Sequence, residues 1–424
     1  MIPLERERSL AGAERVVRAF IAQQGWSARI DSSDTGLQGA LCMVHDADGE
    51  AIGSGFGKGE PEAARVGALY EAVEHIYANS CAPQERVELR AATQLFADPR
   101  YAALPFVAEF GRQASRQLSC LCYRRFFDES DGDALAVPAF LCRPNALADL
   151  LPGDDFDYAS VIRYGSNSGT AIGASLEEAA VHAIGELIER DSWSLFLLAH
   201  YLGDASSFGA WVDPGSLPES VAAVHAAASE QLGREVLLID ATSDLGVPAF
   251  IATTDRILDG EAVFPSGYGA SLYAGHAAIR ALTELVQTVL VGQRLATVGE
   301  YSRQVLQALS EYPKLRACAY FQVERQRMRQ TDWSYPQRER QPPSALLREL
   351  IVTLAGRGID VHHLVHHREG DAFCVVSCVS LELERFLLVT TGMVMAPGRR
   401  GMALLTGGLP VRAMRDASVE TSAG

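Results

Sequence analysis

Apolar residues follow the period of a helix in some stretches of the chain and the period of a strand in others. Apolar side chains three and four positions apart predict helices, and short alternating runs bounded by Gly, Pro, Asn or Asp predict strands. Helices and strands mixed along the chain predict a mixed α/β fold. The predicted helices span 11–24 and 217–233, and the predicted strands span 38–45, 50–55, 117–124, 135–142, 235–239, 373–378 and 386–394.

The clearest helix start lies at Ser175. This residue is a favourable N-cap, and Glu178 three positions later completes a capping box. The Gly- and Ser-rich stretch before it, residues 164–174, predicts a loop that leads directly into a helix reaching residue 198. Polar side chains then recur at spacings of four, four and three, so they share one helical face. They are Glu178, His182, Glu186 and Glu189.

A glycine-rich loop followed by a helix occurs three times in the sequence. The other two copies span 53–77 and 267–290. A single acidic face is more often ordinary solvent-exposed surface, but three copies ending in Glu-x-x-(Glu/Gln) predict faces that converge on one site. In these two copies the residues concerned are Lys58, Glu71, Glu74, Arg280, Glu284 and Gln287.

Convergence would bring five carboxylates together, and like charges at such density are destabilising without cations. Mg²⁺ prefers carboxylate oxygens, and basic side chains and the amides at helix N-termini bind phosphate. The pattern therefore predicts Mg²⁺ at the acidic residues and phosphate oxygens near Lys58, Arg190 and Arg280. The five carboxylates are Glu71, Glu74, Glu186, Glu189 and Glu284.

The three copies resemble the three nucleotide-binding motifs of the YcaO family. Residues 234–254 also resemble the strand, Asp-x-Thr turn and Gly-x-Pro strand between the second and third motifs of that family. The resemblance covers about residues 50–300 with specific motifs, and the rest of the chain more loosely. The residues that carry the motifs are Gly57-Lys58-Gly59 with Glu71, Glu74 and His75, then Ser175 to Asp191, then Arg280-Ala281 with Glu284 and Gln287.

The resemblance implies a YcaO-like α/β domain in which three glycine-loop-to-helix units surround a nucleotide, with ATP and Mg²⁺ as cofactors. One catalytic domain would then occupy residues 1–424, with an N-terminal helix and hairpin (1–50), the motifs (51–300) and a C-terminal segment (301–424). No catalytic residue is assigned. The implied ATP contacts are Lys58, Asn167, Ser168, Ser175, Arg190, Arg280, Glu284 and Gln287. The implied Mg²⁺ ligands are Glu71, Glu74, Glu186 and Glu189.

The activity that the resemblance implies is ATP-dependent activation of backbone amides in a ribosomally made precursor peptide, with phosphorylation of the amide oxygen. In the commonest branch, a Cys, Ser or Thr side chain attacks and yields a thiazoline or oxazoline, as in thiazole/oxazole-modified peptide and antibiotic biosynthesis. The alternatives are thioamide formation, amidine-ring formation, and a non-catalytic scaffold or binding subunit of a peptide-modifying complex.

The sequence departs from the family pattern at three places. Gly67 stands where a Ser is usual, Asn167-Ser168-Gly169 replaces Ser-Asn-Gly, and the chain ends without a proline-rich tail, its last proline being Pro410. The first two departures fall in the nucleotide-contacting region. The third weighs against azoline formation relative to the alternatives.

The resemblance also implies partners. No stretch resembles a ThiF-like or winged-helix module for leader-peptide capture, so we expect a separate subunit of that kind in a multisubunit complex, with this chain as a homodimer in a hetero-oligomeric synthetase. The net charge of −16 argues against nucleic acid as a partner.

Composition adds few constraints. With 48% hydrophobic and 21% charged residues, the chain has no apolar run of membrane-spanning length and no signal-peptide core. We therefore expect no membrane association and a cytoplasmic location. The eight cysteines lack the paired CxxC spacing of a zinc site, which predicts reduced, mostly buried thiols.

Two further segments invite interpretation. Residues 322–341 are highly charged and contain Trp333 and Tyr335; a solvated loop is favoured over a mobile arm or a partner-facing insertion. Residues 361–367 read VHHLVHH, and a strand would place His362 and His366 on one face and His363 and His367 on the other. This spacing matches no standard metal site, so a structural or surface role is favoured.

Overall fold

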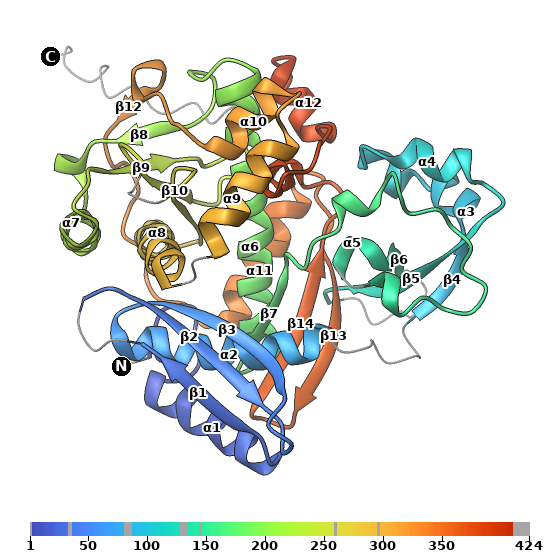
Figure 1. Cartoon of the computed structure of the whole chain (residues 1–424), viewed down its shortest axis with the longest axis horizontal. Coiled ribbons are helices and arrows are strands. Elements are labelled where there is room, and N and C mark those ends of the chain that lie inside the picture. Colours follow the sequence, from blue (N-terminus) through green and yellow to red (C-terminus); the bar gives the residue numbers. More distant parts are fainter. Residues whose placement is uncertain are drawn as a thin grey trace, which may run out of the picture.

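The computed structural model contains three β-sheets and their covering helices within the residues that it describes (Figure 1). The predicted mixed α/β class is confirmed. None of the described helices is long and apolar enough to cross a membrane. The described residues are 2–32, 36–79, 87–127, 134–143, 146–257, 261–294 and 297–409. The chain end from Pro410 onwards lies outside these ranges.

The first sheet is antiparallel, with the strand order β1-β2-β3, and lies at the bottom of Figure 1 with α1 and α2. The predicted N-terminal helix and the hairpin around residues 46–49 are confirmed. However, β3 continues well past residue 55. The elements are α1 (Leu10–Gln23), β1 (Ser27–Asp31), β2 (Gln38–His45), β3 (Ala51–Gly59) and α2 (Pro61–Asn79).

The second sheet has the order β11-β10-β9-β8-β12, and only the edge pair β8–β12 is parallel. The predicted helix at 217–233 and strand at 235–239 are confirmed within one or two residues. The elements are β8 (Ala210–Val212), α7 (Glu219–Leu232), β9 (Val236–Asp240), β10 (Ala249–Thr254), β11 (Ser266–Ala270), α8 (Ala274–Arg294) and β12 (Arg329–Thr331).

The third sheet has the order β4-β5-β13-β14-β7, with β6 paired to β5. It therefore joins strands from the middle of the sequence to strands near its end. Residues 87–164 form the lobe on the right of Figure 1. The strands are β4 (Val87–Ala91), β5 (Gln117–Arg125), β6 (Leu135–Pro138), β7 (Thr170–Gly173), β13 (His362–Glu369) and β14 (Phe373–Val379).

Two predicted strands are wrong in whole or in part. The second half of 135–142 is helical, and 386–394 contains the 3₁₀ helix η9 instead of a strand. Short apolar runs do not distinguish a strand from a buried helical turn. The remaining helices are α3 (Ala92–Ala97), α4 (Val107–Arg112), α5 (Ala139–Cys142), α6 (Leu176–Leu197), the π-helical turn η6 (Leu198–Leu202), α9 (Thr297–Ala308), α10 (Pro313–Tyr320), α11 (Pro343–Ala355), η9 (Phe386–Thr391) and α12 (Arg399–Leu405).

Each sheet supplies one strand that leads into a long helix: β3–α2, β7–α6 and β11–α8. The predicted strand 50–55 continues to Gly59 through the rest of the first glycine-rich segment, and 267–270, predicted as a loop, is also a strand. Only part of the third segment (165–169) is loop. Glycine is needed here because the helix lies directly on the strand. An added Cβ atom would lie 1.8, 2.4 and 2.1 Å from helix backbone at Gly57, Gly173 and Gly269, respectively.

Replacing Gly57 with Ala should therefore destabilise the fold. Its Cβ would overlap the Ala64 carbonyl oxygen, a backbone atom of α2 that cannot turn away. We expect a loss of about 1–3 kcal/mol or more in the free energy of unfolding, measured by urea denaturation. Gly67→Ala in the same helix is the control, because its Cβ would meet only Gly57, at 3.5 Å, and should be neutral or stabilising. Equal stability of the two variants would contradict this account.

Helix α6 runs through the centre of the molecule (Figure 1) and packs against β7, β14, β11 and α11. Ser175 is its N-cap, as predicted, and accepts a hydrogen bond from the Glu178 amide at 3.1 Å. The predicted acidic face is not solvated surface: Glu178 and Glu189 are only 5% and 4% exposed, and Asp191 is fully buried. Polar groups in such a position require partners or ligands.

The charged segment 322–341 is mostly exposed and irregular, but it is anchored to the fold. Its strand β12 extends the second sheet, and Trp333 stacks on Phe250 with ring centroids 5.3 Å apart. The Tyr335 hydroxyl donates a hydrogen bond to Asp240 at 2.8 Å. The prediction of a solvated loop thus holds for most of the segment, but it did not anticipate β12 or the contacts of Trp333 and Tyr335.

The histidine-rich segment forms the predicted strand, β13, but a β-bulge between Val365 and His367 breaks the regular alternation. His363 stacks on Phe126, and His367 stacks on Tyr77. Within the described residues, no group of three or more His, Cys, Asp or Glu side chains could hold a metal ion. The favoured structural role is thus consistent with these contacts. The seven cysteines in the described ranges are free thiols, five of them buried, as predicted.

Candidate functional site

Each of the helices α2, α6 and α8 follows a strand of a different sheet. Acidic and basic side chains of α2 and α8 lie near those in the middle of α6. Helix α2 contacts β7, and α8 contacts both β2 and β3 of the first sheet. As a result, the charges of Glu186 and Glu284 both act on Glu71, and the charge of Glu284 acts on Glu189. The predicted convergence of the acidic residues is therefore present in the structure.

Lys58 projects from β3 and forms an ion pair with Glu284 of α8. Both side chains are about one-fifth exposed, at 20% and 21%. Gln287, one turn further along α8, lies over Gly39, the residue that pairs with Lys58 in the hairpin: a Cβ on Gly39 would be 3.1 Å from the Gln287 Cα. These three predicted residues therefore form one wall of the site.

Arginines from two helices surround the carboxylates of α6. Arg190 lies 3.4 Å from Glu186 and 3.8 Å from Glu189, and Arg280 lies 3.8 Å from the other oxygen of Glu189. Within the described part of the chain, this second oxygen, Glu189 Oε2, is buried without a hydrogen-bond partner. A buried carboxylate oxygen left in this state is costly unless a ligand satisfies it.

The pKa values reflect an excess of buried negative charge. Burial raises the pKa of Glu71 to about 7, and the nearby Glu186 and Glu284 add to the shift. Burial and the charges of Glu71 and Glu186 raise the pKa of Glu74 well above its usual range, although Glu74 accepts a 3.0 Å hydrogen bond from the Ile172 amide. Burial also raises the pKa of Glu189. For Glu284 the effect of burial is outweighed by Lys58 and the arginines, so its pKa is lowered.

The residues present fit a site for oxygen-preferring cations. The five carboxylates face four basic side chains among the described residues, those of Lys58, Arg190, Arg280 and, near Glu74, Arg6, so positive charge is still in deficit. Among the described residues, no three acidic side chains are close enough to share one metal ion as they lie. A divalent cation bound here would nevertheless satisfy the Glu189 oxygen and favour the ionised carboxylates whose pKa values burial raises.

Three of the predicted ATP contacts, Ser168, Asn167 and Ser175, form no ion pair or hydrogen bond with the five carboxylates among the described residues. Ser168 lines a hollow together with Arg190. The neighbouring Asn167 is exposed, and only its backbone carbonyl is engaged, by the Thr170 amide. Ser175 caps α6 and donates to Glu7 at 2.7 Å; it lies about 16 Å along the helix axis from Glu186, at 1.5 Å per residue. Ser175 therefore lies far along α6 from Glu186, whereas the role of Asn167 in binding ATP stays a prediction.

The sequence analysis missed the N-terminal segment, which lies against the start of α6. Arg6 forms a 3.2 Å ion pair with Glu178, and its charge also acts on Glu74 and on His182. Burial, together with the charges of Arg280 and Arg6, lowers the pKa of His182 well below its usual range. The N-terminal segment is short and charged and has no periodic pattern, so the sequence does not predict which element it packs against.

The Glu71 carboxyl should make Mg²⁺ binding depend on pH. Its pKa of about 7 lies above the ordinary value of 4.5, so without metal its contribution to stability is lost as pH rises through this window. Mg²⁺ requires the ionised carboxylate, so Mg²⁺ affinity should rise over the same window. In thermal unfolding, Mg²⁺ should raise the midpoint more at about pH 7.5 than at about pH 5.5. Because the Glu71 side chain remains 37% exposed, we predict the direction only.

Glu71→Gln is the matched variant for this measurement. It should flatten the pH dependence of the Mg²⁺ effect while keeping the side-chain shape. A Mg²⁺ stabilisation that is the same at both pH values in the unaltered chain would contradict the prediction.

Comparison with known proteins bears on the fold and the family. The solved structures that resemble the chain include a heterocyclase in complex with substrate and cofactor (TM-score 0.64, 18% identity, 90% of this chain and 54% of that one). They also include YcaO from Methanopyrus kandleri bound with AMPPCP and Mg²⁺ (TM-score 0.62, 18% identity, 92% and 95%). The Escherichia coli microcin synthetase McbBCD complex with pro-MccB17 bound is a third (TM-score 0.56, 12% identity, 84% and 88%). At these identities the likeness establishes the fold.

Two sequence relatives match a shorter stretch. One is an uncharacterized protein of the tfuA 3′ region of Rhizobium leguminosarum bv. trifolii, 32% identical over 34% of this chain. The other is an uncharacterized protein of Methanothermobacter thermautotrophicus, 37% identical over 34% of this chain. The matched stretch spans about a third of each relative's own length, at 35% and 37%.

The family comparison covers far more of the chain. Residues 56–384 match the family model described as YcaO cyclodehydratase, ATP- and Mg²⁺-binding. This range includes Lys58, the helices α2, α6 and α8, and all five carboxylates. ATP and Mg²⁺ are thus the cofactors of the matched family. The chain belongs to the YcaO family.

Proposed function

We propose that this chain is an ATP- and Mg²⁺-dependent enzyme that activates backbone amides of a ribosomally made peptide by phosphorylation of the amide oxygen. The observation that carries the proposal is the deficit of positive charge at the centre of the fold. Five carboxylates from three helices meet there, and a buried oxygen of Glu189 has no hydrogen-bond partner among the described residues. Carboxylates grouped in this way are suited to bind metal ions.

The roles of individual residues follow from their positions. Glu71, Glu74, Glu186 and Glu189 would hold Mg²⁺, because their carboxylates are the ones with raised pKa values or with an arginine as sole ionic partner. Lys58, Arg190 and Arg280 would be shared between carboxylates and phosphate oxygens, since each is already within 4 Å of an acidic side chain.

Bound Mg·ATP supplies a phosphoryl group that turns the amide oxygen into a good leaving group, with the metal screening the phosphate charge. The contribution of the chain is to orient the reacting groups and exclude water. The site is suited to both tasks because its side chains come from helix backbones packed directly on strands, which leaves little freedom of movement.

The leading product is an azoline ring, formed when a Cys, Ser or Thr side chain of the peptide attacks the activated amide carbon. The second candidate is thioamide formation, in which a sulfur donor attacks instead. A specific observation favours keeping it: one relative is encoded in the tfuA 3′ region, and in the family that this chain resembles, a TfuA-like neighbour points to thioamide formation. A scaffold role is less well supported, because none of the five carboxylates has been lost.

We also propose that the chain acts with partners. These would be the precursor peptide and a separate ThiF-like or winged-helix subunit that binds its leader. The microcin synthetase with a similar fold is itself a complex with bound pro-MccB17. A homodimer within such an assembly is part of the proposal.

The decisive experiment follows the amide oxygen. A candidate precursor peptide that contains Cys, Ser and Thr would be made with heavy oxygen in its backbone carbonyls and incubated with the enzyme, Mg²⁺ and ATP. The proposal expects labelled inorganic phosphate in step with modified peptide. Label released only as water would contradict amide phosphorylation.

The mass of the peptide then separates the products. Loss of one water per site indicates an azoline or amidine ring, whereas exchange of one oxygen for one sulfur, in the presence of sulfide, indicates a thioamide. Unchanged peptide mass with intact Mg·ATP binding would favour the scaffold.

A further inference from the structure

The polar face of α6 carries one neutral side chain among its carboxylates. Glu178, Glu186 and Glu189 on this face each have an arginine within 4 Å. His182 lies one turn before Glu186, and its partner is also an arginine: Arg280 Nη1 is 3.3 Å from its Nδ1. The histidine therefore lies in the same row as the carboxylates and binds an arginine as they do, without adding negative charge.

This contact determines which ring nitrogen of His182 carries the proton. An arginine only donates hydrogen bonds, so Nδ1 must accept, and the proton of the neutral ring is on Nε2. Burial and then the charge of Arg280 lower the pKa of His182 well below its usual range, which agrees with a neutral ring. Within the described residues Nε2 has no hydrogen-bond partner, and this atom is not closed off from solvent. His182 thus keeps one N–H donor for a ligand.

Cationic side chains lie near this donor. The charges of Arg280, Arg6 and Lys58 all act on His182. The Nη2 of Arg280 lies 3.8 Å from Glu189, and its Nε is buried without a hydrogen-bond partner among the described residues. Because the ring that holds Arg280 is neutral, it orients the guanidinium without cancelling its charge. That charge remains available to an anionic ligand.

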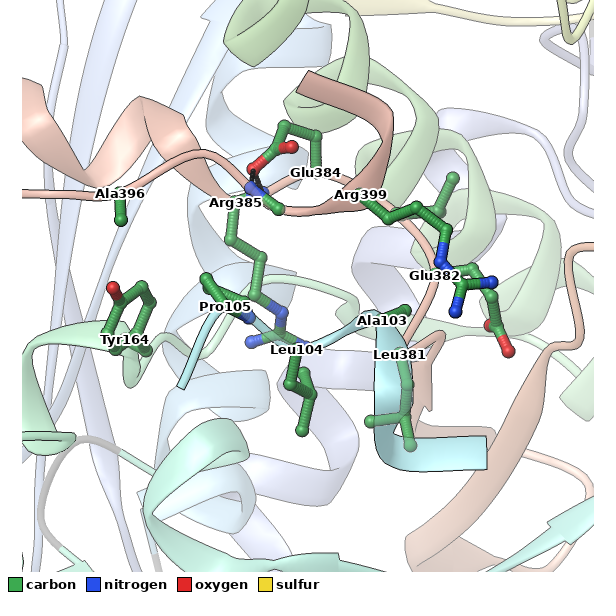
Figure 2. A pocket seen from close by; sticks show the side chains of 12 residues that line it. Ala103, Leu104, Pro105, Tyr164, Leu381, Glu382, Glu384, Arg385, Ala396 and Arg399 are labelled. Carbon is green, nitrogen blue, oxygen red and sulfur yellow. Dashed lines mark hydrogen bonds between the residues drawn. The ribbon is translucent and has the colours of Figure 1, made fainter. Parts of the chain in front are cut away.

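The hollow between the lobe of residues 87–164 and the segment after β14 shows the opposite situation. Figure 2 shows Arg385 and Glu384 among the side chains that line it. Glu384 accepts hydrogen bonds from three backbone amides, at 3.0, 3.0 and 2.8 Å. Arg385 donates to the Leu141 carbonyl at 3.1 Å and also engages the Cys142 side chain. The hollow has room for no more than about one water molecule. It is therefore a feature of packing, and the protein itself occupies these polar groups.

We propose that His182 is a phosphate-binding residue of the nucleotide site, which holds Arg280 through Nδ1 and donates through Nε2–H to a phosphate oxygen of ATP. This inference rests on the proposed function. A neutral donor suits this position, because a further cation would be repelled by the charges of Arg280, Arg6 and Lys58. The phosphates would then lie beside His182, and the metal ions beside the carboxylates one and two turns further along α6.

The test uses three substitutions that separate the two ring nitrogens. Asn places an acceptor near the position of Nδ1, Gln places an N–H near that of Nε2, and Leu supplies neither. Calorimetric titration with Mg·AMPPCP measures the affinity of each variant. His182→Leu should weaken binding about 10- to 100-fold, the value of a lost hydrogen bond to a charged group. His182→Asn and His182→Gln should each recover only part of this loss.

Two controls show whether the effect concerns phosphate. The rise in the midpoint of thermal unfolding that Mg²⁺ alone produces should be the same in His182→Leu as in the unaltered chain, because the carboxylates remain. His225→Leu removes another half-buried helical histidine, which bonds the Val236 carbonyl of β9 at 2.9 Å. This second variant should bind Mg·AMPPCP with normal affinity.

The inference is overturned if His182→Leu binds Mg·AMPPCP as tightly as the unaltered chain. Full recovery of affinity in His182→Asn would also overturn it, because the ring would then act only on Arg280. Loss of the Mg²⁺ effect in His182→Leu would overturn it by placing His182 at the metal. Failure of the proposed function has a different signature: the unaltered chain would bind Mg·AMPPCP but leave the mass of the peptide unchanged in the presence of ATP.

Discussion

Replacing Glu189 with Gln is expected to abolish productive Mg·ATP binding, with a loss of about 100-fold or more in peptide-dependent ATP turnover. Glu189 is almost fully buried, and its Oε2 has no hydrogen-bond partner among the described residues. The amide of Gln keeps the shape of the side chain but removes the charge that would bind a cation. Calorimetric titration with Mg·AMPPCP measures the loss directly.

The fold itself should tolerate this substitution. Burial raises the pKa of Glu189, which means that its charge is unfavourable when no cation is bound. Thermal unfolding of Glu189→Gln without Mg²⁺ should therefore occur at the same temperature as in the unaltered chain, or higher. Glu230→Gln, on the exposed side of α7, controls for loss of a helical carboxylate. Undiminished Mg·AMPPCP affinity in Glu189→Gln would remove this residue from the metal site.

Replacing Arg400 with Met should lower the free energy of unfolding by about 3–5 kcal/mol, as expected when one partner of a buried ion pair is removed. Arg400 of α12 donates to Asp191 at 2.8 and 2.9 Å and to Asp244 at 2.6 Å. Asp191 is fully buried, so the substitution would leave a carboxylate without its main counter-charge. Urea denaturation with the slope compared between variants measures the change.

Arg116→Met provides the matched control for that experiment. Arg116 also pairs with an aspartate at 2.8 Å, but both side chains of this pair are about half exposed, at 54% and 48%. Exposed pairs of this kind contribute about 0–1 kcal/mol. If Arg400→Met cost no more than Arg116→Met, the buried network could not be a major source of stability.

The acidic residues could be predicted from the sequence because their spacing is a property of the helix itself. Glu71 and Glu74, and Glu186 and Glu189, are three apart, which places each pair on one face whatever surrounds it. What linear spacing alone could not give is which oxygens lack partners. That depends on the tertiary structure, which places the guanidinium groups of Arg190 and Arg280 each 3.8 Å from an oxygen of Glu189, beyond hydrogen-bonding distance.

The glycine-rich segments show why part of the fold could not be predicted. Glycine usually marks a loop, and without side chains a strand loses the alternation that identifies it. Only the approach of α2 to within 1.8 Å of a Cβ position at Gly57 explains why a strand there contains so much glycine. The prediction of a strand over residues 386–394 was wrong for a different reason. The Leu387 amide is held by the Ser194 hydroxyl at 2.9 Å, a contact between residues remote in sequence.

The order of strands in the third sheet has a consequence for how the protein is made. Strand β7, which leads into α6, finds its partner β14 only near the end of the chain, where Thr170 pairs with Ser377. During synthesis the ribosome must therefore release nearly the whole chain before α6 can be fixed against that sheet. Pairings between such distant segments form slowly and leave strand edges open meanwhile. Nascent chains of this protein should thus depend on chaperones until β14 emerges, and a truncation before β14 should be degraded rather than accumulate as a folded nucleotide-binding fragment.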